Sequence, residues 1–363
     1  MRSWDRAPPE ILLRCFESLG TLSTRIARVT QQRYPSLIAC SLVCRSWLPC
    51  AQSVLLYCVV PRETEYTAVS WASVKQLVSV LADGSERGAA LAREVKVLKL
   101  QLGVDMHHCG SEEQHADLES LALLVHACQN LQSLYLTQSA LTPPTNIFDA
   151  RQLSLIRTQS SITHLELICD SNPPAIMHQC LNSWPSLTTL RIVAWSLPAP
   201  PRHLPPSCSL RELTAETYGE PSGLILSAAR CLESLTCTLN ALRVIEHVSE
   251  TLRSLTVDCT FPLRASTKEM DTALGILSRC SALERVTFRG GCPDDALEAL
   301  PPTVTHLRIL CSVDATRLAN FIDSRPTLTH VDVQMICLRV RDDLARLHRV
   351  CRSQHIQLGR VHE

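Results

Sequence analysis

The sequence lacks any excess of charge. Its 363 residues include 35 basic and 35 acidic side chains, so the formal net charge is zero, and no four consecutive residues are all basic. Proteins that bind nucleic acid usually concentrate positive charge on one face or in one segment. The balanced charge therefore argues against a nucleic-acid partner.

Signals for secretion and for membrane insertion are also missing. The N-terminal stretch "MRSWDRAPPE" contains no apolar segment of the kind found in signal peptides, and no Asn-x-Ser/Thr acceptor occurs. The longest apolar run, Val54–Val60, is far shorter than the roughly 20 residues that span a bilayer. The 18 cysteines are scattered along the whole chain, unlike a compact disulfide framework. We expect a protein of the cytoplasm, the nucleus or both, with reduced cysteines and no membrane partner.

Catalytic motifs are absent as well. The sequence has no glycine-rich phosphate loop, no Gly-x-Ser-x-Gly and no His-Glu-x-x-His. The stretch "MHHC", Met106–Cys109, places two histidines beside a cysteine, but adjacent side chains point in different directions on regular structure, which favours a polar loop. We expect neither an enzyme nor a bound cofactor. A metal-dependent enzyme would require stoichiometric zinc in the purified protein.

The sequence does contain a short repeated pattern. A hexamer with apolar residues at its first and fourth positions and a small or apolar residue at its sixth occurs ten times after residue 90. Successive copies are separated by 20 to 36 residues, and most separations lie in or near the range of leucine-rich repeats. The ten hexamers begin at Val95, Leu131, Ile162, Leu187, Leu210, Leu232, Leu252, Leu283, Val304 and Leu328.

The hexamers and the stretches between them predict an α/β fold. Apolar and polar residues alternate at the end of each hexamer, which indicates a β-strand. One such strand cannot bury its apolar face alone, whereas stacked copies form a continuous core. Three intervening stretches have the apolar spacing of helices: Asp117–Asn130, Met270–Cys280 and Ala315–Pro326. We therefore predict a leucine-rich-repeat-like solenoid with a parallel sheet and outer helices.

The repeats are degenerate. The longer leucine-rich-repeat pattern, which adds an Asn or Cys and a further Leu, is complete only in Leu232–Leu242. An alternative is that some hexamers are coincidences in a leucine-rich chain, above all those at Val95 and Val304. The proline-rich stretch Pro198–Pro206 is interpreted as a rigid loop between repeats, with a polyproline ligand as the alternative.

A different pattern precedes the repeats. The stretch Ala7–Leu19 begins with two prolines, which suit a helix start, and carries an apolar stripe that includes Ile11 and Phe16. We expect a polar link, Gly20–Ser36, then a second helix over Leu37–Gln52, and a closing segment over Ala51–Val60.

Three cysteines in the second segment could indicate a metal site. Cys40 and Cys44 are four residues apart, and Cys50 follows six residues later. A zinc site needs about four ligands, and beyond these three only Cys15 and Cys58 are close in sequence. Free cysteine often behaves as a small buried apolar residue, so we interpret the cluster as core and expect no bound metal.

The N-terminal pattern resembles an F-box. The segments that carry the resemblance are "PPEILLRCF", "LVCRSW" and "VLLY". The resemblance implies a three-helix unit that binds the Skp adaptor and, through it, the cullin and RING subunits of a ubiquitin ligase. The sequence departs from the family pattern at Ala7, where a leucine is usual. The link between its first two helices is also longer than usual. The adaptor contacts that it implies are Pro9, Ile11, Leu12, Phe16, Leu42, Val43, Trp47, Leu55, Leu56 and Tyr57, although each could equally belong to the unit's own interior.

Together these patterns predict four regions. They are an F-box at 1–60, a linker helix or solenoid cap at 61–92, the repeats at 93–340, and a C-terminal helix and cap at 341–363. The expected function is the substrate-recognition subunit of an SCF-type ubiquitin ligase, in which the repeats bind a substrate protein. The alternative is a leucine-rich-repeat scaffold that acts outside a ligase.

The expected substrate site lies on the strands. The third and fifth residues of each hexamer should point away from the core, on the concave side of the sheet. Near the C-terminal end these positions are rich in Arg and His, and arginine forks suit acidic or phosphorylated groups. An ordinary solvated sheet face is the alternative. The candidate substrate-binding residues are Arg285, Arg289, His306, Arg308 and His330.

Overall fold

The structure is a computed structural model that describes most of the chain. The described residues are 8–21, 30–59, 74–102, 117–138, 147–159, 161–169, 176–194, 209–217, 231–238, 245, 248–259, 272, 274–291, 295–311, 313–334 and 341–361. The stretches Met106–Cys109 and Pro198–Pro206 lie outside them. No helix among the described residues is both long enough and apolar enough to cross a membrane. The chain divides into two compact units, Met1–Asp170 with Pro174–Leu187, and Ser171–Pro173 with Thr188–Glu363.

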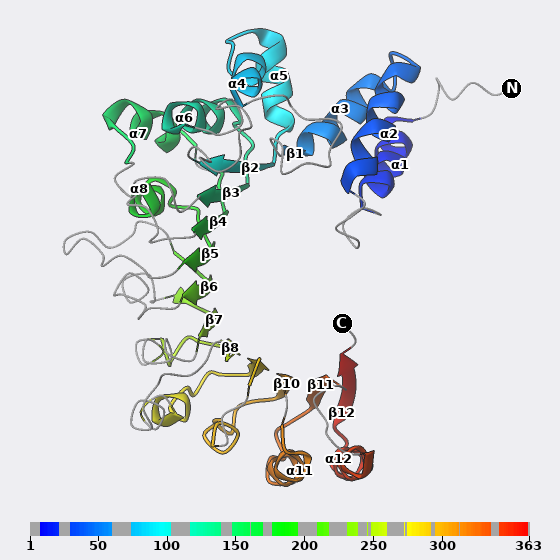
Figure 1. The fold of residues 1–363 in the computed structure, drawn as a ribbon, viewed down its shortest axis with the longest axis vertical. Helices are drawn as coiled ribbons and strands as arrows, with labels where there is room; N and C mark the ends of the chain where they lie inside the picture. Colours follow the sequence, from blue (N-terminus) through cyan, green and yellow to red (C-terminus); the bar gives the residue numbers. More distant parts are fainter. Residues whose placement is uncertain are drawn as a thin grey trace, which may run out of the picture. The chain divides into compact units, whose positions relative to one another are not determined.

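Each unit contains parallel β-strands (Figure 1). The strands of the first unit are β1 (Cys58–Val59), β2 (Val97–Leu102), β3 (Ser133–Gln138) and β4 (His164–Cys169). Those of the second are β5 (Thr189–Ala194), β6 (Glu212–Thr217), β7 (Ser234–Thr238), β8 (Ser254–Asp258), β9 (Arg285–Arg289), β10 (His306–Leu310), β11 (His330–Gln334) and β12 (Gln357–Val361). Within each unit, strands are hydrogen-bonded in chain order, and each pair with a described register is parallel.

The predicted repeat is confirmed. Each of the ten hexamers contributes one strand, which begins two residues after the hexamer's first residue. This includes the hexamers at Val95 and Val304, so the coincidence alternative is wrong for both. The sequence pattern missed two strands: β1, which pairs with β2, and β12, which pairs with β11. The repeat therefore extends by one strand at each end of the predicted series.

Helices lie on one side of the strands in each unit (Figure 1). They are α4 (Val74–Leu81), α5 (Glu86–Glu94), α6 (Leu118–Ala127), α7 (Ala150–Arg157) and α8 (Ile176–Ser183) in the first unit, and α11 (Ala315–Asp323) and α12 (Arg341–Ser353) in the second. A side chain caps the start of α5, α6, α7 and α11, at Ser85, Asp117, Asp149 and Asp314 respectively. Such a cap satisfies a backbone N–H that has no partner within the helix.

The core lies between the strands and the helices. The first residue of every hexamer is at most 3% exposed, and the fourth residue is buried in every strand from β2 to β11. The helices cover these residues with their own apolar faces, for example Leu121 and Val125 of α6, and Leu318 and Ile322 of α11. Both helices lie within stretches whose apolar spacing predicted a helix. The described residues thus form a leucine-rich-repeat-like α/β solenoid.

Three helices precede the repeats, at positions that differ in part from those expected. They are α1 (Pro9–Thr21), α2 (Thr30–Val43) and α3 (Leu48–Tyr57). The single helix expected over Leu37–Gln52 is wrong, because α2 ends at Val43 and a turn precedes α3. Pro49 in the first turn of α3 explains the break: inside a continuous helix it would lack an N–H donor and would clash with the carbonyl of Arg45. α2 also begins at Thr30, within the stretch expected to be a link.

The third helix connects directly to the first repeat. It ends at Tyr57, and β1 follows at the next residue and pairs with β2. The Tyr57 carbonyl accepts a hydrogen bond of 3.1 Å from the Lys96 backbone N–H, and the Ser53 hydroxyl donates one of 2.7 Å to the Glu94 carboxylate of the α5 helix. A cut at residue 60 would therefore remove a strand and a helix contact from the first repeat.

Candidate functional site

The three N-terminal helices have a small interior of their own. Leu12 and Phe16 of α1, Leu37 of α2, and Ala51 and Val54 of α3 are buried against one another. The Trp47 ring meets the Phe16 ring edge-on with centroids 5.5 Å apart, a favourable geometry for aromatic pairs. Trp47 lies in the turn between α2 and α3, so this contact fixes the turn beside α1.

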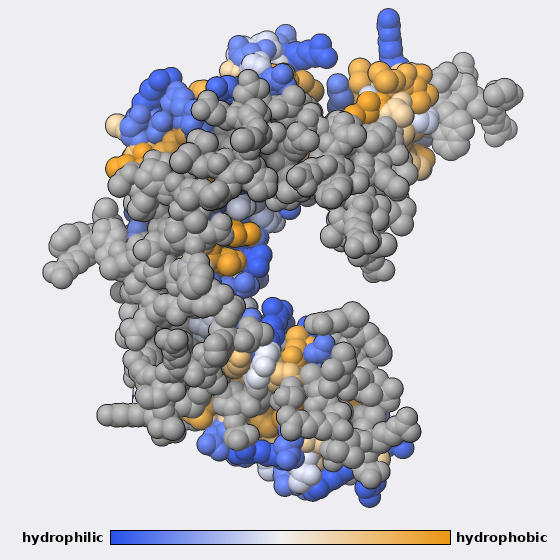
Figure 2. Space-filling view, in the orientation of Figure 1, coloured by the Kyte–Doolittle hydropathy of each residue, from blue (hydrophilic) through white to orange (hydrophobic). Residues whose placement is uncertain are grey.

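Apolar side chains are also exposed on these helices. Among the described residues seven large apolar side chains are exposed, and five belong to α1–α3: Ile11 (49%), Leu42 (79%), Val43 (59%), Leu48 (36%) and Tyr57 (50%). Figure 2 shows apolar residues gathered over this part of the chain. Scattered exposed apolar residues are common, whereas a local concentration marks an interaction surface. We call these five residues the N-terminal apolar surface.

Four of the five lie around one end of the helical unit. Leu42, Val43 and Leu48 flank the turn that Trp47 holds against α1. The Cys50 thiol lies 3.8 Å from the Pro9 carbonyl, which places the start of α3 beside the start of α1, where Ile11 is found. Tyr57 lies at the opposite end of α3, next to the first repeat.

The ten expected adaptor contacts divide into exposed and buried residues. Pro9, Ile11, Leu42, Val43 and Tyr57 are exposed, whereas Trp47 and Leu55 are half-buried and pack against the interior. Leu12, Phe16 and Leu56 are at most 3% exposed. All three are therefore interior residues, and Leu12 and Phe16 belong to the core that the helices form among themselves. Leu48 is exposed and was not among the expected contacts.

The cysteines of this region are spread over different neighbours. The Cys44 thiol lies 3.1 Å from the Ser46 hydroxyl, while Cys50 lies near the Pro9 carbonyl. Burial raises the pKa of Cys40 above its ordinary value of 9.0, although the backbone hydrogen bond at Cys40 opposes this shift. Within the described ranges, no group of three or more His, Cys, Asp or Glu residues could hold a metal ion. The absence of zinc stays a prediction.

The second candidate surface lies on the sheet face opposite the helices. The register aligns the third positions of neighbouring hexamers, such as Arg285 with His306 and His306 with His330. It aligns the fifth positions in the same way, with Thr287 opposite Arg308 and Arg308 opposite Asp332. The five expected substrate-binding residues therefore share one face of β9, β10 and β11.

Three arginines on this face have no carboxylate partner among the described residues. In the part of the chain that the structure describes, Arg285, Arg289 and Arg308 make no ion pair or hydrogen bond through their side chains. Other arginines are paired, as in Arg191–Glu216 between β5 and β6 at 3.3 Å, and Arg253–Glu284 just before β8 and β9 at 3.7 Å.

Two histidines stack on the same face. The rings of His306 and His330 are nearly parallel, with centroids 4.4 Å apart. The Nδ1 atom of each ring lies 2.8 or 2.9 Å from the hydroxyl of the preceding threonine, Thr305 or Thr329. Burial lowers the pKa of His306 below its ordinary value of 6.5, and the charges of His330 and Arg285 lower it further. Asp332 and Glu284 act in the opposite direction and more weakly.

Asp332 faces Arg308 in the register but lies over a glycine instead. A Cβ atom built on Gly359 of β12 would collide with the Asp332 carboxylate. That carboxylate therefore occupies the space left open by the missing side chain on the strand beyond it. This placement is consistent with the absence of an Asp332–Arg308 ion pair. We call Arg285, Arg289, Arg308, His306 and His330 the cationic sheet face.

Sequence reasoning missed a regular polar feature at the start of the strands. The residue before the first hexamer position is Ser or Thr in six of ten repeats. In four described repeats this hydroxyl lies within hydrogen-bonding distance of the first-position carbonyl of the preceding repeat. The second positions of four hexamers carry charges of alternating sign. They form two ion pairs, Arg211–Glu233 at 3.8 Å and Arg253–Glu284 at 3.7 Å. The recurring Ser/Thr was the sequence signal for this feature.

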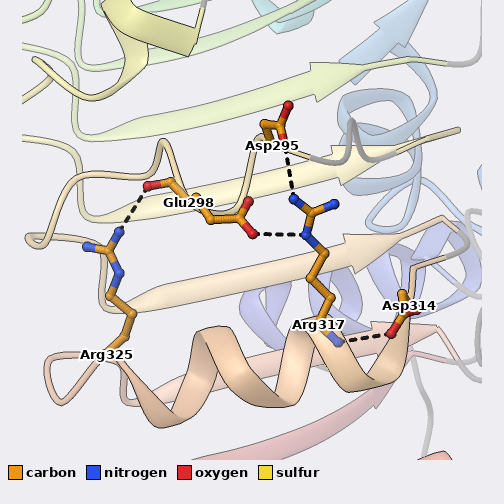
Figure 3. Close-up of polar contacts among 5 residues, drawn as sticks. All are labelled: Asp295, Glu298, Asp314, Arg317 and Arg325. Carbon is orange, nitrogen blue, oxygen red and sulfur yellow. Dashed lines mark hydrogen bonds and ion pairs between the residues drawn. The ribbon is translucent and has the colours of Figure 1, made fainter.

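A charged network ties together the helix side of the second unit. The Arg317 guanidinium donates to Asp295 and to Glu298 at 2.9 Å each, and the Arg317 backbone N–H donates to Asp314 at 2.9 Å (Figure 3). Arg325, at the other end of α11, donates to the Glu298 and Leu300 carbonyls at 3.3 and 2.7 Å. Every one of these charges has a partner within the chain, so the network stabilises the fold rather than offering a binding site.

Comparison with known proteins gives only distant similarities. No family model matches the chain, and no curated protein matches its sequence. Three solved structures are similar in part: the TLR13–ssRNA13 complex (13% identity, TM-score 0.35), the complex of Rad7 and Elc1 in yeast (15%, 0.30) and the leucine-rich repeat domain of APL1B (13%, 0.26). The matches cover 68%, 93% and 67% of this chain, and 43%, 91% and 60% of the other chains. The chain thus spans less than half of the TLR13 chain, and TM-scores below 0.5 carry no functional argument.

Proposed function

We propose that this chain is the substrate-recognition subunit of an SCF-type cullin-RING ubiquitin ligase. The N-terminal helices would bind the Skp adaptor, and the repeats would bind a substrate protein. Through the adaptor the chain would join the cullin and RING subunits. It would catalyse no reaction itself. It would act in the cytoplasm, the nucleus or both.

One observation supports this proposal most strongly. Five of the seven exposed large apolar residues among those described lie on three short helices. Four of the five, Ile11, Leu42, Val43 and Tyr57, occupy positions that the F-box resemblance gives to adaptor contacts. A unit of this size buries little apolar surface on its own, so a partner that covers its exposed residues would stabilise it. The solenoid offers an extended polar sheet face for a second partner.

Co-purification with the Skp adaptor tests the proposal. Leu42→Asp and Val43→Asp each place a charge on the N-terminal apolar surface without disturbing the buried interior. We expect each to abolish co-purification, because an unpaired charge at an apolar interface is strongly unfavourable. Val80→Asp is the matched control, since Val80 is an exposed (37%) valine on α4 outside the surface. It should leave the adaptor bound.

Leu12 is unsuitable for this test. It is only 2% exposed, so Leu12→Asp would unfold the helices and remove adaptor binding whether or not Leu12 touches the adaptor. Deletion of residues 1–60 has a similar drawback, because it removes β1 and the contact between α3 and α5. Surface substitutions separate the two causes.

The alternative function is an interaction scaffold outside a ligase. It shares the solenoid and its sheet face but requires no adaptor. If the parent chain fails to co-purify with the Skp adaptor, or if Leu42→Asp and Val43→Asp both co-purify as the parent does, the ligase assignment is wrong and the scaffold becomes the better description.

A further inference from the structure

We propose that the cationic sheet face binds a phosphorylated serine or threonine in a partner protein. The identity of that partner as a ligase substrate rests on the proposed function, whereas the binding chemistry does not. The site would centre on Thr287, with Arg285, Arg289 and Arg308 around it and the stacked pair His306–His330 along one side.

The strand register places the three arginines around one point. Arg285 and Arg289 precede and follow Thr287 on the same face of β9, and Arg308 of β10 lies directly opposite Thr287. Neighbouring strands are about 4.8 Å apart and alternate residues about 6.6 Å apart. Each β9 arginine therefore starts roughly 8 Å from Arg308, a distance that long guanidinium side chains can close around a single anion.

A phosphoryl group suits this arrangement better than a carboxylate. It carries three terminal oxygens and close to two negative charges, so it can accept hydrogen bonds from several guanidinium forks at once. The Thr287 hydroxyl adds a donor at the centre. A single carboxylate has two oxygens and one charge, and one arginine fork already satisfies it.

No described residue competes with an external anion for these arginines. None of the three has an ion pair or side-chain hydrogen bond among the described residues. Asp332, the carboxylate that faces Arg308 in the register, lies over Gly359. Arg285 lies opposite His306 in the register and contributes to the lowered pKa of that histidine.

The occupant is expected to be a protein segment rather than a nucleic acid. A polyanion needs many phosphate contacts spread along an extended basic surface. Here the three arginines are flanked by acidic residues, Asp258 of β8 on one side and Asp332 of β11 on the other. A patch of this extent matches one phosphoryl group, with polar strand positions on either side for the flanking peptide.

A peptide array followed by solution binding tests the proposal. The whole chain is applied to peptides that have a central phosphoserine and randomised flanks, and the best sequence is then measured by fluorescence anisotropy. The same sequence with serine or with glutamate at the centre provides the ligand controls. We expect at least about tenfold tighter binding of the phosphorylated form, in line with charge-assisted hydrogen bonds. Inorganic phosphate should compete.

Four variants locate the site. Arg285→Glu with Arg308→Glu should weaken binding by about 100-fold or more, because two charge-assisted contacts are lost. Arg308→Lys, which keeps the charge but removes the fork, should weaken it several-fold. Asp332→Asn should tighten binding, since it removes a facing negative charge. The control Arg349→Glu with Arg352→Glu makes the same change in net charge on exposed residues of α12 and should bind as the parent does.

Several results would overturn the proposal. They are an array without phosphoserine-dependent binding, equal binding of the glutamate peptide, equal loss in the α12 control, and tighter binding of a single-stranded oligonucleotide through the same arginines. Adaptor co-purification of the same variants separates this proposal from the proposed function. The sheet variants should keep the adaptor, and Leu42→Asp should lose the adaptor while keeping the phosphopeptide.

Discussion

Leucine 42 provides the sharpest quantitative test of the N-terminal apolar surface. It is 79% exposed in the free chain, so Leu42→Ala should change the free energy of unfolding by less than about 0.5 kcal/mol. If the adaptor buries it, most of the roughly 1.5–3 kcal/mol that a buried leucine contributes is lost on substitution. Allowing for the Cβ atom that alanine keeps, we expect a loss of about 1–2 kcal/mol, or a roughly 5- to 30-fold weaker Kd.

Leucine 12 gives the opposite pattern and serves as the control. It is 2% exposed, and Leu12→Ala should destabilise the helices by about 2–5 kcal/mol. Isothermal titration with the Skp adaptor gives Kd, and hydrogen exchange of peptides from α1, α2 and α3 reports their stability in the free chain. Leu42→Ala should change Kd alone, whereas Leu12→Ala should speed exchange as well. A Leu42→Ala variant with a Kd within twofold of the parent, or with faster exchange in these helices, would refute the reasoning.

Three further predictions concern the repeats. The pKa of His306 is lowered below 6.5 in the folded chain, so the unfolded chain takes up the proton first as the pH falls. The stability of the folded chain therefore decreases as the pH drops through 6.5. His306→Gln should reduce the loss of Tm between pH 7.5 and pH 5.5, and an unchanged loss would contradict this. Arg317→Met should cost about 1 kcal/mol in urea unfolding at low salt and less at high salt, whereas a salt-independent cost would exclude an ionic origin. Burial raises the pKa of Cys237 to about 12, so iodoacetamide should label exposed Cys231 in the native chain at pH 7.5 and Cys237 only after unfolding, as peptide mass spectrometry would show.

Much of the solenoid could be predicted because its strands repeat one physical pattern. Each hexamer places apolar residues where a strand must face the core, and the ten copies confirmed one another even where a single copy, such as that at Val304, was weak. The two terminal strands were not predicted because they depart from the pattern: β1 is two residues long, and β12 contains Gly359 at an outward position. Both are defined by pairing with a neighbour, which a local pattern does not report.

The N-terminal helices were harder to predict because their break depends on one residue. The apolar spacing of Leu37–Gln52 is compatible with a continuous helix, and Leu37 and Cys40 do pack into the interior of the helical unit. Pro49 was the available signal for the break after Val43. Spacing also could not separate Leu12 from Ile11, since both are apolar and adjacent, and only the packed helices show that one is buried and the other exposed.

The two candidate surfaces differ in how far sequence can reveal them, and the reason is physical. In the repeats, core and recognition occupy alternate positions of a strand, so outward residues such as Arg285 and Arg308 can change without altering the buried ladder. Their positions were therefore predictable. The lack of a carboxylate partner for them among the described residues depended on three-dimensional placement, above all that of Asp332 over Gly359. In the helices, apolar residues serve both the interior and the exposed surface, so residue type carries no information about the division. A solenoid thus separates folding from recognition within each strand, whereas the small helical unit must share one residue class between them.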